Sequence, residues 1–569
     1  MPLNLLHRSR AQISRTAIER LYIAMRHLLI RGSYKPLGVS GEAMIEALTE
    51  LRPEIYGSIN EPERVELNGL LYIFQRLPKG IEECRYIKLI SREGYENATF
   101  QPIIPPKRRR NAYRIDQEEM YIEMTRGRSD IYDILTHLTF MYIESEKIRR
   151  NSENNRAEKR REWRMLEEIV RREAAGEEFD REVAYTYLST LLGRTYQETV
   201  EACRRFAEDN NVNSIFHITY WLGRLSSEEA RDKNDREISF SSTLREMIGH
   251  HLHGEHWAQA IKQAIYDNKL EGRPLHIISA NLHSVMNSLY AEAALQKLLP
   301  KKTHEELFPL LSMPENGELR QKVSRYASLH GMRQLDDTSG TNVSVQLFDL
   351  AKIKQVPRRY DWTAPADAAQ IPVLIVMDYA FGEQAYETLD ELLRPHELVA
   401  DRKNLPVQSI NIMGKAGILR GDKGDIMVPT AHVFEGTADN YPFHNDLTTA
   451  DLANDLGLQV CTGPMITVLG TSLQNRDVLR YFLKSSWRAI GLEMEGAHYQ
   501  KAIQSASKIR HSISPEVVLR YAYYASDNPL ETGSTLASGS LGLDGVAPTY
   551  LITQVFLHKI FQQLPLQAH

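Results

Sequence analysis

The chain has 569 residues, of which 42% are hydrophobic and 25% charged, and its formal net charge is −5. This composition excludes a largely disordered or fibrous chain, and the length predicts two to four domains. The balanced charge gives no general attraction to nucleic acid, and no apolar run approaches the roughly 20 residues that span a bilayer. Neither nucleic acid nor a membrane is therefore an expected partner. The three cysteines lie far apart and the N-terminus is polar and basic, which predicts a cytoplasmic protein.

Residues 1–350 are expected to form a mainly α-helical region, with two subdomains as one option. Apolar residues recur at helical spacing in the segments 18–29, 131–142, 185–192 and 282–299. The run 147–172 is densely charged with alternating signs, which predicts a long solvated helix or a mobile connection. The sequence does not decide whether this region regulates, oligomerises or covers a site.

Three polar motifs in this region have a plain and a functional interpretation. Lys107-Arg-Arg-Arg110 is expected to be a solvated charge run, with an anionic lipid or nucleic acid as the alternative. The cluster His250–His256 places two histidines three residues apart, but no partner set completes a metal site. We therefore expect structural or surface histidines, and no metal. The segment Asp336–Asn342 is expected to be a linker turn, or otherwise a cover over a site.

The pattern changes in residues 351–569, which we expect to form an α/β catalytic domain. Short apolar runs occur at 371–377, 408–413, 425–428, 459–461, 489–492 and 519–525. Helical stretches at 383–393, 474–483 and 497–507 separate several of them. Strands that are buried on both faces and alternate with helices predict a mostly parallel central sheet flanked by helices.

Polar residues follow four of these runs. They lie in the segments Asp378–Glu383, Gly414–Gly417, Glu493–Gly496 and Ser526–Pro529. Because α/β sheets bind ligands at the carboxyl ends of their strands, we expect these segments to meet at one edge. Carboxyl groups that meet there can divide the work, one remaining ionised and another staying protonated as a general acid.

The order of these motifs resembles the nucleoside phosphorylase/nucleosidase superfamily. The resemblance lies in Gly414-Lys-Ala-Gly417, Gly424-Asp-Ile-Met-Val-Pro429, Leu492-Glu-Met-Glu-Gly-Ala497 and Ala525-Ser-Asp-Asn-Pro-Leu530, and it covers about residues 370–565. Within the superfamily the sequence is most similar to AMP nucleosidases and methylthioadenosine/S-adenosylhomocysteine nucleosidases. The resemblance implies a nucleoside phosphorylase-like α/β fold, a homo-oligomer and no cofactor.

Carried over by position, the resemblance implies a role for each of five residues. Asp527 would protonate the purine at N7, and Ser526 would hold that carboxyl group. Glu495 would accept hydrogen bonds from the ribose hydroxyls, and Met494 would pack against the ribose. Glu383 would orient the attacking water, because nucleosidases carry a glutamate after their first strand.

The remaining candidates are substrate-binding residues. Glu493 shares a strand face with Glu495, and Gly414, Lys415, Ala416 and Gly417 form the expected glycine turn. Lys415 stands where the family has a small hydroxyl residue. It is expected to bind an anionic group such as a 5′-phosphate, to pair with a site carboxylate, or to face solvent.

Each candidate also has a structural interpretation. Asp527 suits a turn, Met494 suits the core, and Glu383 suits the start of a helix, where the dipole favours a carboxylate. One of the glutamates 493 and 495 would then pair with a surface arginine. The ordered set of motifs favours the functional interpretation.

The leading hypothesis is a purine nucleosidase-like hydrolase that acts on a nucleoside or a nucleotide. The arginines with which phosphorylases hold phosphate are missing from Asp378–Glu383 and from Ile412-Met413, which favours hydrolysis over phosphorolysis. A phosphorylase is the first alternative. A purine-nucleotide sensor without turnover is the second.

Overall fold

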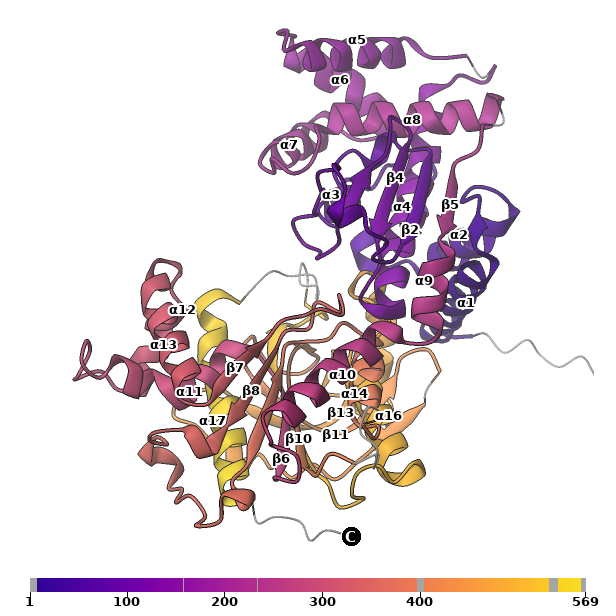
Figure 1. Ribbon diagram of the computed structural model, residues 1–569. Coiled ribbons are helices and arrows are strands. Elements are labelled where there is room, and N and C mark those ends of the chain that lie inside the picture. The colour runs from indigo at the N-terminus through magenta and orange to yellow at the C-terminus, as the bar shows by residue number, and fades with distance from the viewer. Residues whose placement is uncertain are drawn as a thin grey trace, which may run out of the picture. The chain divides into compact units, whose positions relative to one another are not determined.

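The structure is a computed structural model that describes residues 8–156, 158–232, 234–396, 404–437, 439–531 and 541–563. The chain divides into two compact units (Figure 1). Unit 1 runs to His250 and takes in Ser472–Val478, and unit 2 contains His251–Thr471 and the chain from Leu479 onward. This division differs from the boundary near residue 350 that the sequence suggests, because strands before that point belong to the sheet of unit 2.

Unit 1 contains a five-stranded mixed sheet and is therefore not simply helical. Its strand order is β1 (Ser33–Tyr34), β5 (Glu237–Phe240), β2 (Tyr86–Ile90), β4 (Glu119–Glu123), β3 (Ala112–Arg114). The three inner strands are parallel and the two edge strands are antiparallel. The helices are α1 (Arg10–Arg31), α2 (Val39–Leu51), α3 (Leu67–Phe74), α4 (Gly127–Ser152), α5 (Arg161–Ala175), α6 (Arg181–Leu192), α7 (Tyr196–Ala207), α8 (Ile215–Asp232) and α9 (Ser242–Gly249).

The charged run 147–172 belongs to two helices rather than one. Helix α4 ends at Ser152 and α5 begins at Arg161, and a bridge between Glu153 and Lys159 closes the turn. Lys147, expected to be solvated, is buried and donates to the Ser58 carbonyl at 2.9 Å. The expectation of a single solvated helix is therefore wrong.

Unit 2 is built on a ten-stranded mixed sheet. Along the main path the strands follow the order β12 (Asn440–Pro442), β11 (Ile426–Phe434), β13 (Val460–Thr467), β14 (Gly491–Glu493), β10 (Val407–Ile418), β6 (Leu275–Ser279), β9 (Val373–Met377), β8 (Val345–Asp349), β7 (Met332–Leu335), and β15 (Val518–Asp527) pairs with both β10 and β11. All six predicted apolar runs overlap strands of this sheet.

Part of this sheet closes on itself. Strand β10 pairs in parallel with β15, β15 pairs with β11, β11 with β13, β13 with β14, and β14 returns to β10. The result is a five-stranded ring with an open arm that continues from β10 through β6 and β9. Strand β10 therefore belongs to both parts and is the centre of the unit.

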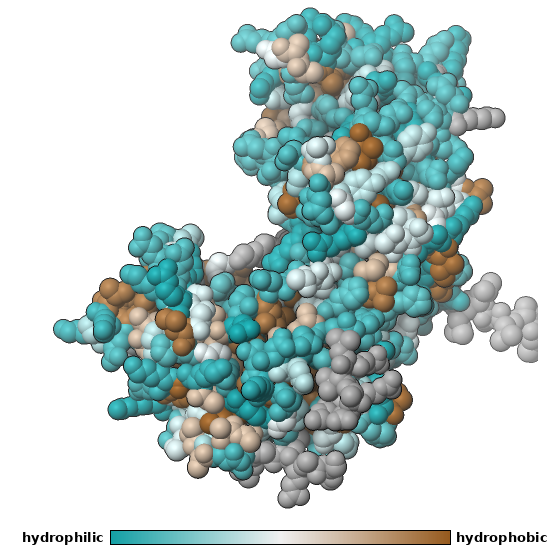
Figure 2. All heavy atoms as spheres, in the orientation of Figure 1, coloured by the Kyte–Doolittle hydropathy of each residue, from teal (hydrophilic) through white to brown (hydrophobic). Residues whose placement is uncertain are grey.

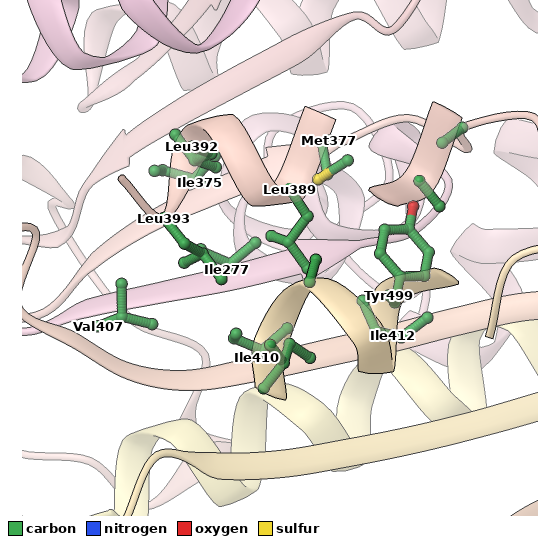
Figure 3. Close-up of a cluster of buried hydrophobic side chains, with 14 of the residues drawn as sticks. Ile277, Ile375, Met377, Leu389, Leu392, Leu393, Val407, Ile410, Ile412 and Tyr499 are labelled. Carbon is green, nitrogen blue, oxygen red and sulfur yellow. The ribbon is translucent and has the colours of Figure 1, made fainter. Parts of the chain in front are cut away.

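Helices cover both faces of the sheet. Helices α10 (Leu252–Asp267), α14 (Gln384–Leu392) and α16 (Gly496–Gln504) pack on one face, where Ile277, Ile375 and Ile410 point (Figure 3). Helices α11 (Leu282–Leu295), α12 (His304–Ser312), α13 (Gly317–Leu329) and α17 (Val546–Gln562) pack on the other. Helix α15 (Arg476–Lys484) is divided between the two units, because Arg476–Val478 belongs to unit 1. Neighbouring residues of one strand face opposite layers, which explains the continuous apolar runs in the sequence.

Hydrophilic side chains dominate the surface that Figure 2 shows, and apolar residues occur there in small separate groups. Among the described residues, none of the helices combines the length and the apolarity that a bilayer crossing needs.

Candidate functional site

The segment Gly414–Gly417 is part of strand β10 and does not form the expected glycine turn. Its residues continue the parallel ladder with β15, where Gly414 lies opposite Tyr523 and Lys415 opposite Tyr524. A Cβ atom on Gly414 would come within 2.7 Å of the Tyr523 ring, so the glycine is required by the close packing of this ring. The backbone of this segment is paired in the β10–β15 ladder, so the segment does not form the turn that was expected to bind an anion.

Gly417 is the point where the motifs meet. It lies opposite Leu492 on β14 and opposite Asp527 on β15, just past a register shift at Ala416. Glu493 and Glu495 follow Leu492 closely in the chain. The sheet register thus brings the Leu492–Ala497 and Ala525–Leu530 motifs to the same end of β10, as the sequence predicts.

Glu493 is directed into the protein and organises the start of helix α16. It is 2% exposed, and its Oε2 accepts hydrogen bonds from the backbone N–H groups of Glu495 and Gly496. The Thr467 hydroxyl donates to Oε1. Burial, with Glu495 as the second cause, raises the pKa of Glu493 to about 8. At neutral pH this carboxyl group is therefore mostly protonated, and it is placed to hold the loop rather than a substrate.

Glu495 is less buried and lies at the N-cap of α16. Its Oε1 accepts a hydrogen bond of 2.8 Å from the Gly382 N–H, which ties the loop after β9 to the loop after β14. Met494, between the two glutamates, is 8% exposed and lies in the protein interior. The two glutamates therefore differ in environment although they are only two residues apart.

Asp527 and Ser526 form the end of β15. The Ser526 hydroxyl lies 2.5 Å from Asp527 Oδ1 and 3.1 Å from the Ala416 carbonyl oxygen. Both residues are buried, with Asp527 6% exposed. Lys415 is exposed in the same region; desolvation lowers its pKa, and the nearby Asp527 carboxyl opposes that shift.

Glu383 does not follow the first strand of the sheet, which is the position that the resemblance implies for it. Strand β9, which precedes it, comes after β6, β7 and β8 in the chain and is separated from β10 by β6. The residue is 9% exposed and lies at the N-cap of α14. Its neighbour Gly382 donates to Glu495, so Glu383 lies next to the contact between the two loops. It follows β9 and not β6, the first strand of the sheet.

Strand β6 is the first strand of the sheet, and the sequence analysis missed it. Asn281 caps α11 after this strand and accepts from the His283 N–H at 2.9 Å. Ser279, the last residue of β6, lies 3.2 Å from the Tyr499 hydroxyl on α16. The signal was present in Leu275-His-Ile-Ile-Ser279, a short apolar run that precedes a good helix cap.

The other polar motifs have structural roles. Within His250–His256, the buried His253 ring lies 2.8 Å from the Ser339 carbonyl oxygen. In Asp336–Asn342, the Asp337 carboxylate accepts from the N–H groups of Ser339, Gly340 and Asn342, which stabilises a turn.

One group of possible metal ligands occurs among the described residues, in unit 1. The ligand atoms of Glu82, Glu83 and His217 lie within 4.8 Å of one another. Glu83 also pairs with Arg114 at 3.0 Å and with His217 at 2.8 Å, so these side chains form an ion-pair network.

The sequence matches a protein family described as a family of unknown function, DUF6909, over residues 42–301 and 309–562. The chain belongs to this family. No curated protein matches it.

Several solved structures are similar to about half of the chain. A 5′-methylthioadenosine/S-adenosylhomocysteine nucleosidase from Campylobacter jejuni is 11% identical, covers 51% of this chain and 99% of its own, and has a TM-score of 0.31. Futalosine hydrolase from Helicobacter pylori is 12% identical over 51% of this chain and 97% of its own, with a TM-score of 0.28. Uridine phosphorylase from Schistosoma mansoni is 13% identical over 50% and 85%, with a TM-score of 0.30.

Proposed function

We propose that unit 2 hydrolyses the N-glycosidic bond of a purine nucleoside or nucleotide. The products are the free base and a sugar or sugar phosphate. One observation carries the proposal: Gly417 lies opposite both Leu492 and Asp527, so Glu495 and Asp527 flank one end of β10. This is the juxtaposition that the reaction needs, with one carboxyl group for the base and another for the sugar.

Asp527 and Glu495 have different roles in the proposed reaction. Cleavage builds positive charge on the sugar and negative charge on the leaving base. Asp527, held by the Ser526 hydroxyl, protonates the base, and such general acid catalysis is typically worth about 10²–10⁴-fold in rate. Glu495 accepts the ribose hydroxyls and adds negative potential beside the developing cation.

The neighbouring Glu493 affects the negative charge of the proposed site and the position of Glu495. Because its pKa is raised to about 8, the pair 493/495 carries less negative charge at neutral pH than two ionised carboxylates. We infer that Glu493 fixes the loop that presents Glu495, and Met494 packs behind that loop. Glu493 is then a positioning residue, since its oxygens are used by backbone N–H groups.

A direct test is base release by the purified chain. The protein is incubated with AMP, adenosine, methylthioadenosine, S-adenosylhomocysteine, inosine and guanosine, with and without phosphate, and the products are separated by chromatography. Release of base without phosphate is expected. Release only with phosphate, together with ribose 1-phosphate, would establish a phosphorylase instead.

The variant Asp527→Asn tests the acid. It should lower base release by about 10²–10⁴-fold while ligand binding, measured by calorimetry, remains largely intact. Glu495→Gln should weaken both binding and turnover. Asp544→Asn is a matched control because this aspartate is paired with Lys423 at 3.0 Å and is exposed. A wild-type rate in Asp527→Asn would remove Asp527 from the mechanism.

A purine-nucleotide sensor is the second candidate, and the position of Glu383 favours it. The expected water-orienting glutamate follows the first strand, but that strand is β6 and Asn281 stands there. A sensor would bind an adenine compound with saturation and release no base from any of the six substrates.

A further inference from the structure

Two adjacent glutamates and a histidine meet in unit 1, where a short 3₁₀ helix packs against α8. The 3₁₀ helix, Ile81–Glu83, carries the glutamates, and His217 lies in the first turn of α8. His217 Nε2 lies 2.8 Å from Glu83 Oε1 and 3.8 Å from Glu82 Oε1. One imidazole nitrogen and two carboxylate oxygens therefore face the same small space.

Glu82 is the member of this group whose hydrogen bonding is incomplete. The residue is only 1% exposed, and its Oε1 accepts a hydrogen bond of 2.6 Å from the Asn213 amide. Its Oε2 is also buried and has no hydrogen-bond partner in the described part of the chain. A buried carboxylate oxygen that has lost water without gaining a partner is costly, and a cation bound to this carboxyl group would supply the missing interaction.

Neighbouring residues hold the other two side chains in place. Arg114 pairs with Glu83 Oε2 at 3.0 Å, which leaves Oε1 for the side facing His217. Arg114 is itself anchored, because it donates to the Gly80 carbonyl at 2.8 Å. The His217 N–H donates to the Ser214 hydroxyl at 3.2 Å, which fixes the start of α8. Such outer contacts orient metal ligands before the ion arrives.

The distances suit a small divalent ion. Zinc bonds to imidazole nitrogen and carboxylate oxygen are about 2.0–2.2 Å long, so in a tetrahedral site the ligand atoms lie about 3.3–3.6 Å apart. The separations of 2.8 and 3.8 Å lie on either side of this range. The side chains of Glu83 and His217 are 25% and 24% exposed, so they have room for the small shift that binding requires.

The donor set also indicates the class of metal. Imidazole is a common ligand of zinc and other late transition metals, whereas Mg²⁺ and Ca²⁺ prefer sites made of oxygen atoms alone. Two carboxylates offset the charge of a divalent ion. Three protein ligands leave a fourth position, which water can occupy because Glu83 and His217 reach the surface.

We propose that unit 1 binds Zn²⁺ through Glu82, Glu83 and His217. The ion takes the place of the hydrogen between His217 Nε2 and Glu83 Oε1 and gives Glu82 the partner that it lacks. It connects the segment 81–83 to α8, since Glu83 and His217 are 134 positions apart in the chain. Binding to the folded state alone stabilises that state, so the ion should raise the unfolding temperature.

The test is metal binding by the full-length protein after treatment with a chelator and dialysis. ZnCl₂ is added in isothermal titration calorimetry at neutral pH, and MgCl₂ is used in a parallel titration. One equivalent of Zn²⁺ is expected to bind, and Mg²⁺ should bind about tenfold more weakly or not at all. Differential scanning calorimetry should show a higher unfolding temperature with Zn²⁺.

Two variants test the ligands. His217→Gln and Glu82→Gln should each weaken Zn²⁺ binding by about tenfold or more and remove the rise in unfolding temperature. Glu82→Gln keeps the size of the side chain and can still accept from Asn213, so it should fold even if His217→Gln does not. His256→Gln is the matched control, because His256 is an exposed histidine of the cluster His250–His256 and lies in unit 2.

The outcomes separate this site from other zinc ligands. The proposal is overturned if the wild type binds Zn²⁺ no better than Mg²⁺, or if His217→Gln and Glu82→Gln bind Zn²⁺ as the wild type does. Loss of binding in His256→Gln would also overturn it, because the ion would then belong to the other histidine cluster. Base release by unit 2 is measured separately, so either proposal can fail alone.

Discussion

Glu493 shows how a single carboxyl group can make the stability of the protein depend on pH. Its pKa is raised from 4.5 to about 8 in the folded protein. The folded state therefore binds more protons than the unfolded state between these two values, and stability falls as the pH rises through this window. A pKa that differs by one between the folded and unfolded states corresponds to about 1.4 kcal/mol of stability, so the total effect is a few kcal/mol.

The variant Glu493→Gln should remove this dependence. Glutamine is neutral at every pH, its oxygen can accept both backbone N–H groups, and its amide can donate to Thr467. We expect the free energy of unfolding, measured with urea from pH 5 to 9, to vary less steeply than in the wild type. Glu516→Gln, a change at an exposed glutamate, should leave the slope unchanged. An unchanged slope in Glu493→Gln would show that Glu493 is ionised in the folded protein.

At the scale of elements, the approach of β10 to β15 depends on a missing side chain. Gly414→Ala would place a methyl group 2.7 Å from the Tyr523 ring. Such overpacking typically costs about 1–3 kcal/mol, and we expect a loss of that size in chemical denaturation. Gly470→Ala is the control, because nothing lies within 4 Å of a Cβ atom at that position. If the two variants are equally stable, the ring does not limit this position.

The same strand explains where sequence reasoning succeeded and where it failed. Residues such as Ile375 and Ile410 are apolar because helices cover both faces of the sheet, so the strands are visible in the sequence. A glycine pair is typical of turns, and the sequence therefore predicts a turn at Gly414. The real reason for this glycine is the Tyr523 ring, more than a hundred residues away in the chain, and no local pattern carries that information.

Arg108 and Arg110 form ion pairs with Asp133 and Asp130, so the expectation of a solvated run at 107–110 is wrong for these two residues. Their pairing escaped prediction for a related reason. Arg108 and Arg110 look solvated because four cations stand together in the sequence. Their counter-charges, Asp130 and Asp133, lie on a helix that begins after two intervening strands. Burial of a charge depends on such partners, and sequence position alone does not reveal which carboxylates will meet which arginines.

At the scale of the whole molecule, the chain returns to unit 1 late in its course. Asn475, in the segment Ser472–Val478, is 3% exposed and donates to the Leu51 carbonyl at 2.8 Å. Its own Oδ1 accepts from the N–H groups of Asp477 and Val478, at the start of α15. Unit 1 is therefore discontinuous, and cutting the chain at residue 250 removes part of its packing.

Asn475→Ala should lower the free energy of unfolding by about 1–3 kcal/mol, because it removes a helix cap and a buried hydrogen bond together. Differential scanning calorimetry would detect the change as a lower unfolding temperature. Asn211→Ala, at an exposed loop position, should have little effect. A wild-type unfolding temperature in Asn475→Ala would mean that the hydrogen bonds of the Asn475 side chain add nothing to the stability of the protein.

The ring of five strands has a consequence for the nascent chain. Strand β10 is the first strand of the ring to be made, but its partner β15 is the last. At about 5–20 residues per second, ribosomal synthesis takes on the order of ten seconds to pass from one to the other. Until then β10 and β11 each expose an apolar edge that can pair with other chains. A message that is truncated before residue 518 would produce a polypeptide whose ring can never close, and such a product should aggregate or be captured by chaperones.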